Sequence, residues 1–206
     1  MGFLNIEELL YRIPALLIAV TVHEFMHGMT ASIFGDTTAK EQGRLSLNPI
    51  KHLDPVGTLM IIIAGFGWAK PVPVNPYRFK KPGKHMMLVG LAGPLANFAT
   101  AFILAKFFYL PLPHSIATLL MVTVWINVML GIFNLLPIPP LDGSKIIPYF
   151  LPSRMQQPWY RFEQYGFVIL LLLIVMVPGF FNTVLGRPIE FMLRLIFTGV
   201  PVPYNI

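Results

Sequence analysis

The sequence contains no cysteine and little charge. With no Cys among 206 residues, disulfide bonds, a redox dithiol, a cysteine nucleophile and a thiolate metal site are all excluded. Any metal would have to be held by His and carboxylate side chains. Only 12% of the residues are charged, whereas 55% are hydrophobic, and the apolar residues form long runs instead of the alternating pattern of a soluble domain. These features predict an integral membrane protein.

Four apolar runs are long enough to cross a bilayer, for which a helix needs about 20 residues. They cover residues 13–34, 86–110, 115–136 and 164–181. Prolines follow the second and third runs and end the corresponding helices. We therefore expect an all-α integral membrane protein with about four transmembrane helices, forming a single membrane-embedded domain over residues 1–206.

The loop between the first two predicted spans, residues 43–84, is rich in Gly, Pro and basic residues. Within it, the apolar run Val56–Trp68 is too short for a comfortable crossing, which predicts a re-entrant or interfacial segment. The prolines of Ala69–Pro76 predict an extended backbone. Near the C-terminus, residues 189–200 are apolar apart from Glu190 and Arg194, which predicts an amphipathic surface helix.

The formal net charge is +6, which on its own is compatible with nucleic-acid binding. However, the basic residues gather in the loops before the second span and after the third, the pattern that orients membrane proteins with the basic side toward the cytoplasm. We therefore expect no nucleic-acid partner. We expect a multi-pass protein of the cell membrane, embedded in a lipid bilayer, with the C-terminal end of the first span facing the cytoplasm.

The first apolar run contains the pentapeptide His23-Glu24-Phe25-Met26-His27. Its histidines are four residues apart, so on a helix both imidazoles lie on one face and can reach one tetrahedral metal ion. Glu24 is placed to act on water at that metal. A helix-packing cluster of hydrogen bonds is the alternative, but desolvating His, Glu and His in a membrane span is costly unless they are paired or metal-bound. The motif favours a zinc site with Glu24 as general base.

A catalytic zinc site needs a third protein ligand and an open position for water. Asp142 is the prominent candidate, because the prolines that end the third span leave an extended strip before it that could return the carboxylate toward the first helix. Local sequence is equally compatible with Asp142 as a turn residue or as the N-cap of a short helix over residues 144–150. The residues alone leave these alternatives open.

The pentapeptide 23–27, together with the later pattern Asn134-x-x-Pro137-x-Pro139-x-x-Asp142-Gly143, resembles the site-2 protease family. The segments Gly93–Asn97 and Gly43–Pro49 extend the resemblance over nearly the whole chain. The resemblance is to the short form of the family, without an appended peptide-binding or nucleotide-sensing domain. It implies that Asp142 is the third ligand, beside His23 and His27, of one zinc ion per chain.

Other polar residues in apolar surroundings have less specific signals. Asn97 and Asn134 are candidates for holding substrate backbone or an oxyanion, with helix-to-helix hydrogen bonding as the alternative. Asn127 lies near the helical face of Asn134 but belongs to no motif, so we expect it to pack between helices. His52 is a candidate for supporting a metal ligand through a hydrogen bond.

These features together predict an intramembrane zinc metalloprotease that hydrolyses peptide bonds of transmembrane proteins or peptides near the cytoplasmic face. In that function Glu24 is the general base and acid for water at the zinc. The alternatives are a membrane transporter that holds a divalent ion on its intramembrane His and Asp residues, and an inactive protease-like scaffold that binds membrane partners.

Overall fold

The computed structural model describes residues 6–64, 67–177 and 179–201. These residues form helices and connecting loops, and the β-structure among them is one isolated bridge between Leu53 and Ala69. The elements are α1 (Ile6–Ile33), α2 (Thr38–Glu41), η1 (Pro49–His52), α3 (Pro55–Ala64), η2 (Pro76–Arg78), α4 (Pro82–Ala105), η3 (Lys106–Tyr109), α5 (His114–Asn134), α6 (Asp142–Phe150), α7 (Ser153–Glu163), α8 (Gly166–Met176), η4 (Phe181–Leu185) and α9 (Gly186–Ile196). The predicted all-α architecture is confirmed.

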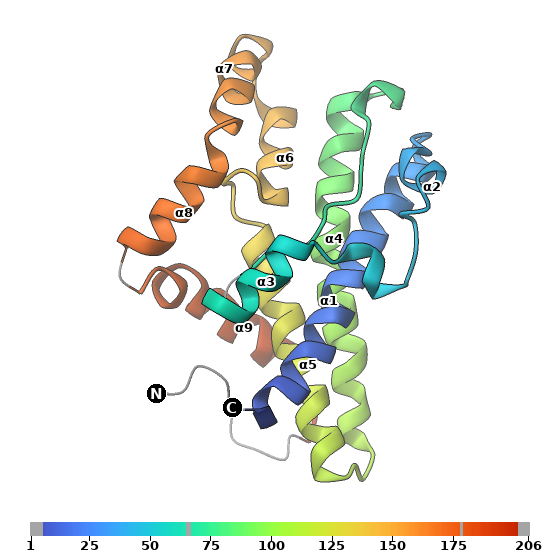
Figure 1. Ribbon diagram of the computed structural model, residues 1–206, viewed down its shortest axis with the longest axis vertical. Coiled ribbons are helices and arrows are strands. Elements are labelled where there is room, and N and C mark those ends of the chain that lie inside the picture. Colours follow the sequence, from blue (N-terminus) through green and yellow to red (C-terminus); the bar gives the residue numbers. More distant parts are fainter. Residues whose placement is uncertain (1–5, 65–66, 178, 202–206) are drawn as a thin grey trace.

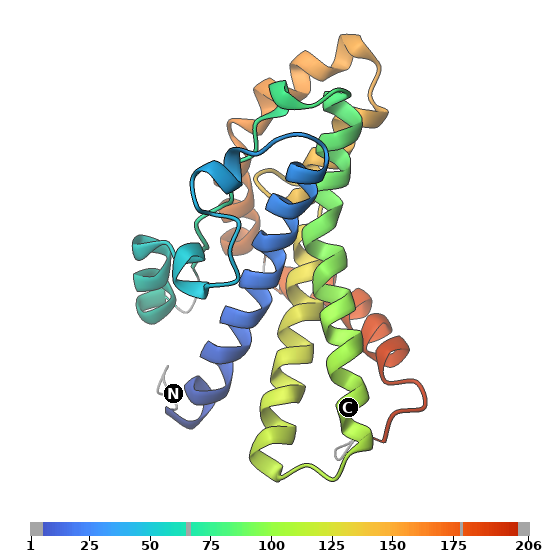
Figure 2. The same ribbon diagram turned by 90° about the vertical axis from the view of Figure 1, so that its right-hand side faces the viewer.

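Helices α1, α4 and α5 run side by side in alternating directions and form the central bundle (Figures 1 and 2). In the described part of the chain they are the three helices long and apolar enough to cross a membrane. Small side chains allow the close approach, since Ala15 and Ala19 of α1 are fully buried against Ile126 of α5. Three of the predicted spans are therefore confirmed, although α1 begins at Ile6, well before the predicted start at residue 13.

The fourth predicted span, a continuous helix over residues 164–181, is wrong in its extent. Helix α8 has only 11 residues, a length of about 17 Å, and so is much shorter than the hydrocarbon core. Helix α7 precedes it at an angle of 63°, and the two meet the length and hydropathy criteria for a span only as a bent pair. The break falls at Gln164 and Tyr165, between the polar helix α7 and the apolar helix α8. The sequence pattern located the apolar run but did not predict this bend.

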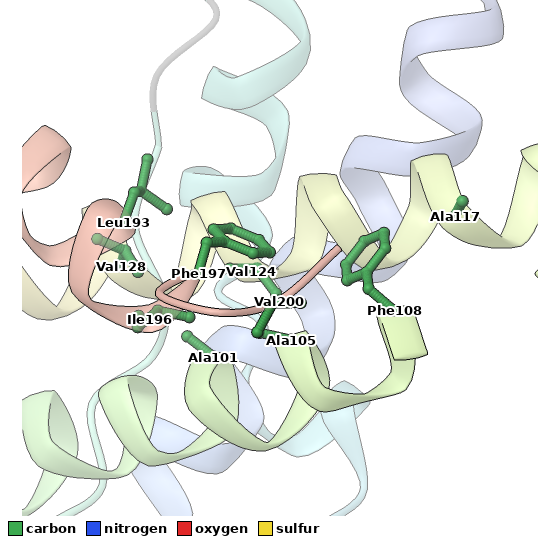
Figure 3. Packing of buried hydrophobic residues seen from close by; sticks show 10 residues of the cluster. All are labelled: Ala101, Ala105, Phe108, Ala117, Val124, Val128, Leu193, Ile196, Phe197 and Val200. Carbon is green, nitrogen blue, oxygen red and sulfur yellow. The ribbon is translucent and has the colours of Figure 1, made fainter. Parts of the chain in front are cut away.

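The predicted C-terminal surface helix is present as α9, and it packs on the bundle through its apolar face. Figure 3 shows Leu193 and Ile196 among small and branched side chains of α4 and α5. On the outer side, Glu190 and Arg194 form an exposed ion pair one helical turn apart. The full buried cluster is Ala101, Ala105, Phe108, Ala117, Val124, Val128, Leu193, Ile196, Phe197 and Val200.

The connection between α1 and α4 contains the short helix α3 and an extended segment, residues 69–75, which we call the strap. Helix α3 has 10 residues, so its length fits the predicted re-entrant or interfacial segment, whose position in the membrane stays a prediction. The strap is held at both ends. The Lys70 N–H donates to the His52 carbonyl at 2.9 Å, and the Asn75 N–H donates to Asp36 Oδ2 at 2.6 Å. As predicted, residues 70–75 lie outside any helix, whereas Pro76 begins the short helix η2.

Glycine at position 166 permits the contact between α8 and the proline segment that leads to Asp142. A Cβ at this position would lie 2.2 Å from Pro139 Cβ and 2.6 Å from the Pro139 carbonyl oxygen. We predict that Gly166→Ala lowers the free energy of unfolding by about 1–3 kcal/mol through overpacking, measured as a lower melting temperature in detergent. Gly186→Ala is the matched control, because a Cβ there meets no atom within 4 Å. Equal melting temperatures for the two variants would contradict this packing.

Candidate metal centre

Three buried side chains from two helices converge in the interior of the bundle. The Nε2 atoms of His23 and His27 lie 2.8 Å and 3.0 Å from Asp142 Oδ2 and 3.0 Å from each other. The two imidazole rings are nearly perpendicular, at 84°. Each of the three residues is at most 5% exposed. In the described part of the chain, His23, His27 and Asp142 form the group of His and carboxylate side chains that could hold a metal ion.

The other ring nitrogen of each histidine is engaged as a donor. His27 Nδ1 lies 2.7 Å from the Val89 carbonyl oxygen, which can only accept. His23 Nδ1 lies 2.6 Å from Asn97 Oδ1. Because both Nδ1 atoms carry a proton, each imidazole in its neutral form presents the Nε2 lone pair to the other ring and to the carboxylate.

Asn97 fixes the position of His23 and is itself fully engaged. Its Nδ2 donates to the Ala19 carbonyl at 3.0 Å and to Asn127 Oδ1 at 2.9 Å, so the atom facing His23 must be the amide oxygen. Asn97 is completely buried, and both of its amide hydrogens are used within the protein. The structure contradicts the prediction that Asn97 holds substrate, because its amide group is used up by His23, the Ala19 carbonyl and Asn127. Asn127 links α4 and α5, as the sequence predicted.

The convergence of three electron-pair donors fits a bound cation. A single proton can bridge two of these atoms with good geometry, whereas a metal ion can be shared by all three. The ligand separations of 2.8–3.0 Å approach the ~3.3 Å between ligands about 2.0 Å from a tetrahedral zinc. Two imidazoles and one carboxylate suit zinc and leave one tetrahedral position open for water or substrate.

Asp142 is the first residue of α6, and Leu141 is the N-cap, so the alternative of Asp142 as N-cap is not realised. The residues before it form bends and turns, with the Leu141 N–H bonded to the Ile138 carbonyl at 2.9 Å. The predicted extended strip is therefore wrong, but the proline segment does return the carboxylate to α1. Asp142 Oδ1, the oxygen away from the imidazoles, accepts from Lys145 Nζ at 2.8 Å.

Gly93 contributes space to the site. A Cβ on Gly93 would lie 2.5 Å from His27 Nε2 and 2.7 Å from His23 Nε2, so any side chain there would displace both imidazoles. Gly93 belongs to the segment Gly93–Asn97 that extends the family resemblance, but the sequence did not indicate that it makes space for the imidazoles. The sequence analysis did not identify Lys145 as part of the site. The only indication in the sequence was its position three residues after Asp142, which on a helix brings the two side chains together.

Glu24 lies beside the two histidines and lines a cavity of about 470 Å³ together with His23, His27, Asp142 and Asn134. Its Oε2 accepts from the Val72 N–H of the strap at 2.8 Å. Among the described residues Oε1 has no hydrogen-bond partner. The strap therefore orients the carboxylate while one oxygen stays available in the cavity.

The remaining two candidates have different surroundings. Asn134 lines the cavity and uses its amide nitrogen to bond the Leu130 carbonyl at 3.0 Å, so its availability to a substrate stays a prediction. His52 is buried in the loop and bonds the Ser46 carbonyl at 2.7 Å. Within the described residues it bonds none of the three converging side chains, so the prediction that it supports a ligand is wrong. His52 instead anchors the strap through its carbonyl oxygen.

We predict that Gly93→Ala abolishes zinc binding, because the added methyl group would occupy the space next to both Nε2 atoms. Gly83→Ala, on the same helix, is the control, since a Cβ there meets no atom within 4 Å. Zinc per chain is measured by elemental analysis after dialysis against a weak chelator. A Gly93→Ala protein that keeps as much zinc as the wild type would contradict the placement of the site.

We predict that Asn97→Leu weakens zinc binding about 10–100-fold, because His23 loses the acceptor that fixes its orientation. Asn134→Leu should leave zinc affinity unchanged, since Asn134 bonds the Leu130 carbonyl and neither histidine. Competition with a fluorescent chelator measures both affinities, and circular dichroism verifies that each variant is folded. Similar zinc affinities for the two variants would refute this role for Asn97.

Comparison with known proteins supports zinc as the metal. The family model "Peptidase family M50" matches residues 111–177, which include Asp142. The chain is 46% identical over 177 residues to "Putative zinc metalloprotease YwhC" of Bacillus subtilis, covering 80% of each chain. It is 30% identical over 167 residues to "Putative zinc metalloprotease Rip2" of Mycolicibacterium smegmatis, covering 77% of this chain and 64% of that protein. No solved structure gave a significant match. The chain belongs to Peptidase family M50, the site-2 protease family of membrane zinc metalloproteases.

Proposed function

We propose that this protein hydrolyses peptide bonds of transmembrane proteins or peptides at a site within the membrane, near its cytoplasmic face, and that Glu24 is the general base and acid. The proposal rests on one observation. The three converging side chains, His23, His27 and Asp142, line the same cavity as Glu24, whose Oε1 is available. A metalloprotease needs this combination, because the metal and the base must act on the same water molecule.

Each residue of the site has a distinct task in this reaction. His23, His27 and Asp142 hold the zinc, which when bound polarises a carbonyl group and makes water more acidic. Glu24 accepts the proton of the attacking water on Oε1 and delivers it to the departing amine. Its Oε2 stays bonded to the Val72 N–H, so the carboxylate keeps its orientation through both proton transfers.

The substrate must present an extended backbone to this site, because the carbonyl groups of a regular helix are engaged in hydrogen bonds. The cavity of about 470 Å³ is large enough for a few residues of an unwound segment. Its walls are mostly apolar and come mainly from α1, α4, α5, α6, α8 and the strap, which suits apolar substrate side chains. Asn134, in the wall on α5, is positioned to bond substrate backbone.

The depth of the site supports cleavage near one membrane face. His23 lies ten residues before the end of α1 at Ile33, a distance of about 15 Å along the helix. The connection that follows this end of α1 contains seven of the 15 Lys and Arg residues, among them Lys40, Lys51 and Lys80. Because basic loops face the cytoplasm, we place the site on the cytoplasmic side.

Substitution of Glu24 separates this function from an ion transporter and from an inactive scaffold. We predict that Glu24→Gln keeps about as much zinc as the wild type but loses cleavage of a model transmembrane peptide, because the amide cannot accept the proton of water. Asp142→Ala should lose both zinc and cleavage, since it removes one of three ligands. Elemental analysis and mass spectrometry of the peptide products in detergent measure the two quantities.

Each outcome decides a different part of the proposal. Cleavage by Glu24→Gln at the wild-type rate would exclude Glu24 as the base. A wild-type protein that binds zinc without cleaving any transmembrane peptide would favour the transporter or scaffold. A wild-type protein that binds no zinc in any preparation would contradict the metalloprotease assignment itself.

A further inference from the structure

Lys145 is the one Lys or Arg side chain that lines the cavity within the described residues. It lies on the first turns of α6, and its Nζ donates to Asp142 Oδ1 at 2.8 Å. Asp142 is only 6% exposed at its side chain, whereas Lys145 is 37% exposed. The ammonium group is therefore tied to a metal ligand on one side and open to the cavity on the other.

The ammonium group has donors to spare. Lys145 carries three N–H groups, and Asp142 Oδ1 is its one hydrogen-bond acceptor among the described residues. The two carboxylate oxygens of Asp142 are divided between Lys145 and the imidazoles. This division places the ammonium next to the zinc ligands without making it a ligand.

The backbone of α4 is shaped to admit this arrangement. A Cβ on Gly90 would lie 3.0 Å from the Asp142 carbonyl oxygen and 3.2 Å from Lys145 Cβ. Gly90 and Gly93 are one helical turn apart, so the same face of α4 accommodates the stem of Lys145 and the two imidazoles. The position of Lys145 therefore follows from close packing between α4 and α6.

We propose that Lys145 is a catalytic residue whose free N–H groups stabilise the negative charge that develops on the substrate carbonyl oxygen. This inference rests on the proposed proteolytic function. As the oxygen of water adds to the carbonyl carbon, the C=O bond becomes a C–O⁻ bond, and a preorganised cationic donor stabilises that oxygen in a largely apolar cavity. Lys145 keeps its protons throughout, because the proton of water travels to the amine through Glu24.

Asn134 and Thr58, two other side-chain donors in the cavity wall, are weaker candidates for this role. Asn134 is neutral and already donates to the Leu130 carbonyl. Thr58 donates its hydroxyl hydrogen to the Asp54 carbonyl at 2.7 Å. A charged donor forms hydrogen bonds roughly twice as strong as those of neutral groups, so Lys145 is the residue that would distinguish the anionic transition state from the neutral substrate.

The test compares Lys145→Met with Lys145→Arg and with Lys84→Met as matched control, because Lys84 lies at the exposed start of α4 and not in the cavity wall. Each purified, zinc-loaded variant is assayed for kcat and KM on the model transmembrane peptide and for zinc per chain. Affinity is measured for two ligands, the uncleaved peptide on a Glu24→Gln background and a phosphinic peptide, which has the tetrahedral anionic geometry of the transition state.

Lys145→Met is expected to keep its zinc and its affinity for the uncleaved peptide, and to lose about 10²–10³-fold in kcat, the effect of removing one oxyanion donor. Its affinity for the phosphinic peptide should fall by a similar factor, because only that ligand has the developing charge. Lys145→Arg retains a cationic donor and should recover at least part of kcat. Lys84→Met should behave as the wild type.

Three results would overturn the inference. The first is a kcat of Lys145→Met close to that of the wild type. The second is a loss of zinc in parallel with the loss of kcat, which would mean that Lys145 only supports Asp142. The third is an affinity of Lys145→Met for the phosphinic peptide equal to that of the wild type. In each case cleavage by the wild type and its absence in Glu24→Gln would still establish the proposed function. Absence of cleavage by the wild type would instead overturn that function.

Discussion

The convergence of three lone pairs in the interior of an apolar bundle is the constraint on which the rest of this structure depends. Two imidazole nitrogens and a carboxylate oxygen lie within hydrogen-bonding distance of one another, while both Nδ1 protons point away from the centre toward acceptors. Without a cation such an arrangement is electrostatically unfavourable, and burial increases the penalty. A zinc ion bound by these three atoms would offset this penalty, and folding would then be coupled to metal binding.

Several sequence features follow from that constraint. Helix α4 must pass close to the imidazoles, which requires the absence of a side chain at Gly93. It must also supply an acceptor to each histidine, and it does so with the Asn97 side chain and the Val89 carbonyl. Helix α6 has to start beside α1, so that its first residue, Asp142, reaches the two imidazoles. The strap completes the site from the loop side by bonding Glu24.

Much of this architecture could be predicted from the sequence. The spacing of His23 and His27 defines their common face because a helix turns once in 3.6 residues, and apolar runs locate the three long helices. The bend between α7 and α8 could not be predicted in the same way, because hydropathy reports composition and not direction. The roles of Asn97 and His52 also depended on three-dimensional contacts. Both residues have the chemistry to support a ligand, but only Asn97 lies against His23.

Zinc held by two imidazoles and one carboxylate has a characteristic X-ray absorption spectrum. That spectrum is measured at the zinc edge of the purified, detergent-solubilised protein. We predict nitrogen and oxygen ligands at about 2.0–2.2 Å with the multiple-scattering features of two imidazole rings, and loss of the bound zinc in His27→Ala, which removes one of the three side chains. A wild-type spectrum with no imidazole scattering, or an unchanged spectrum and zinc content in His27→Ala, would exclude this set of ligands.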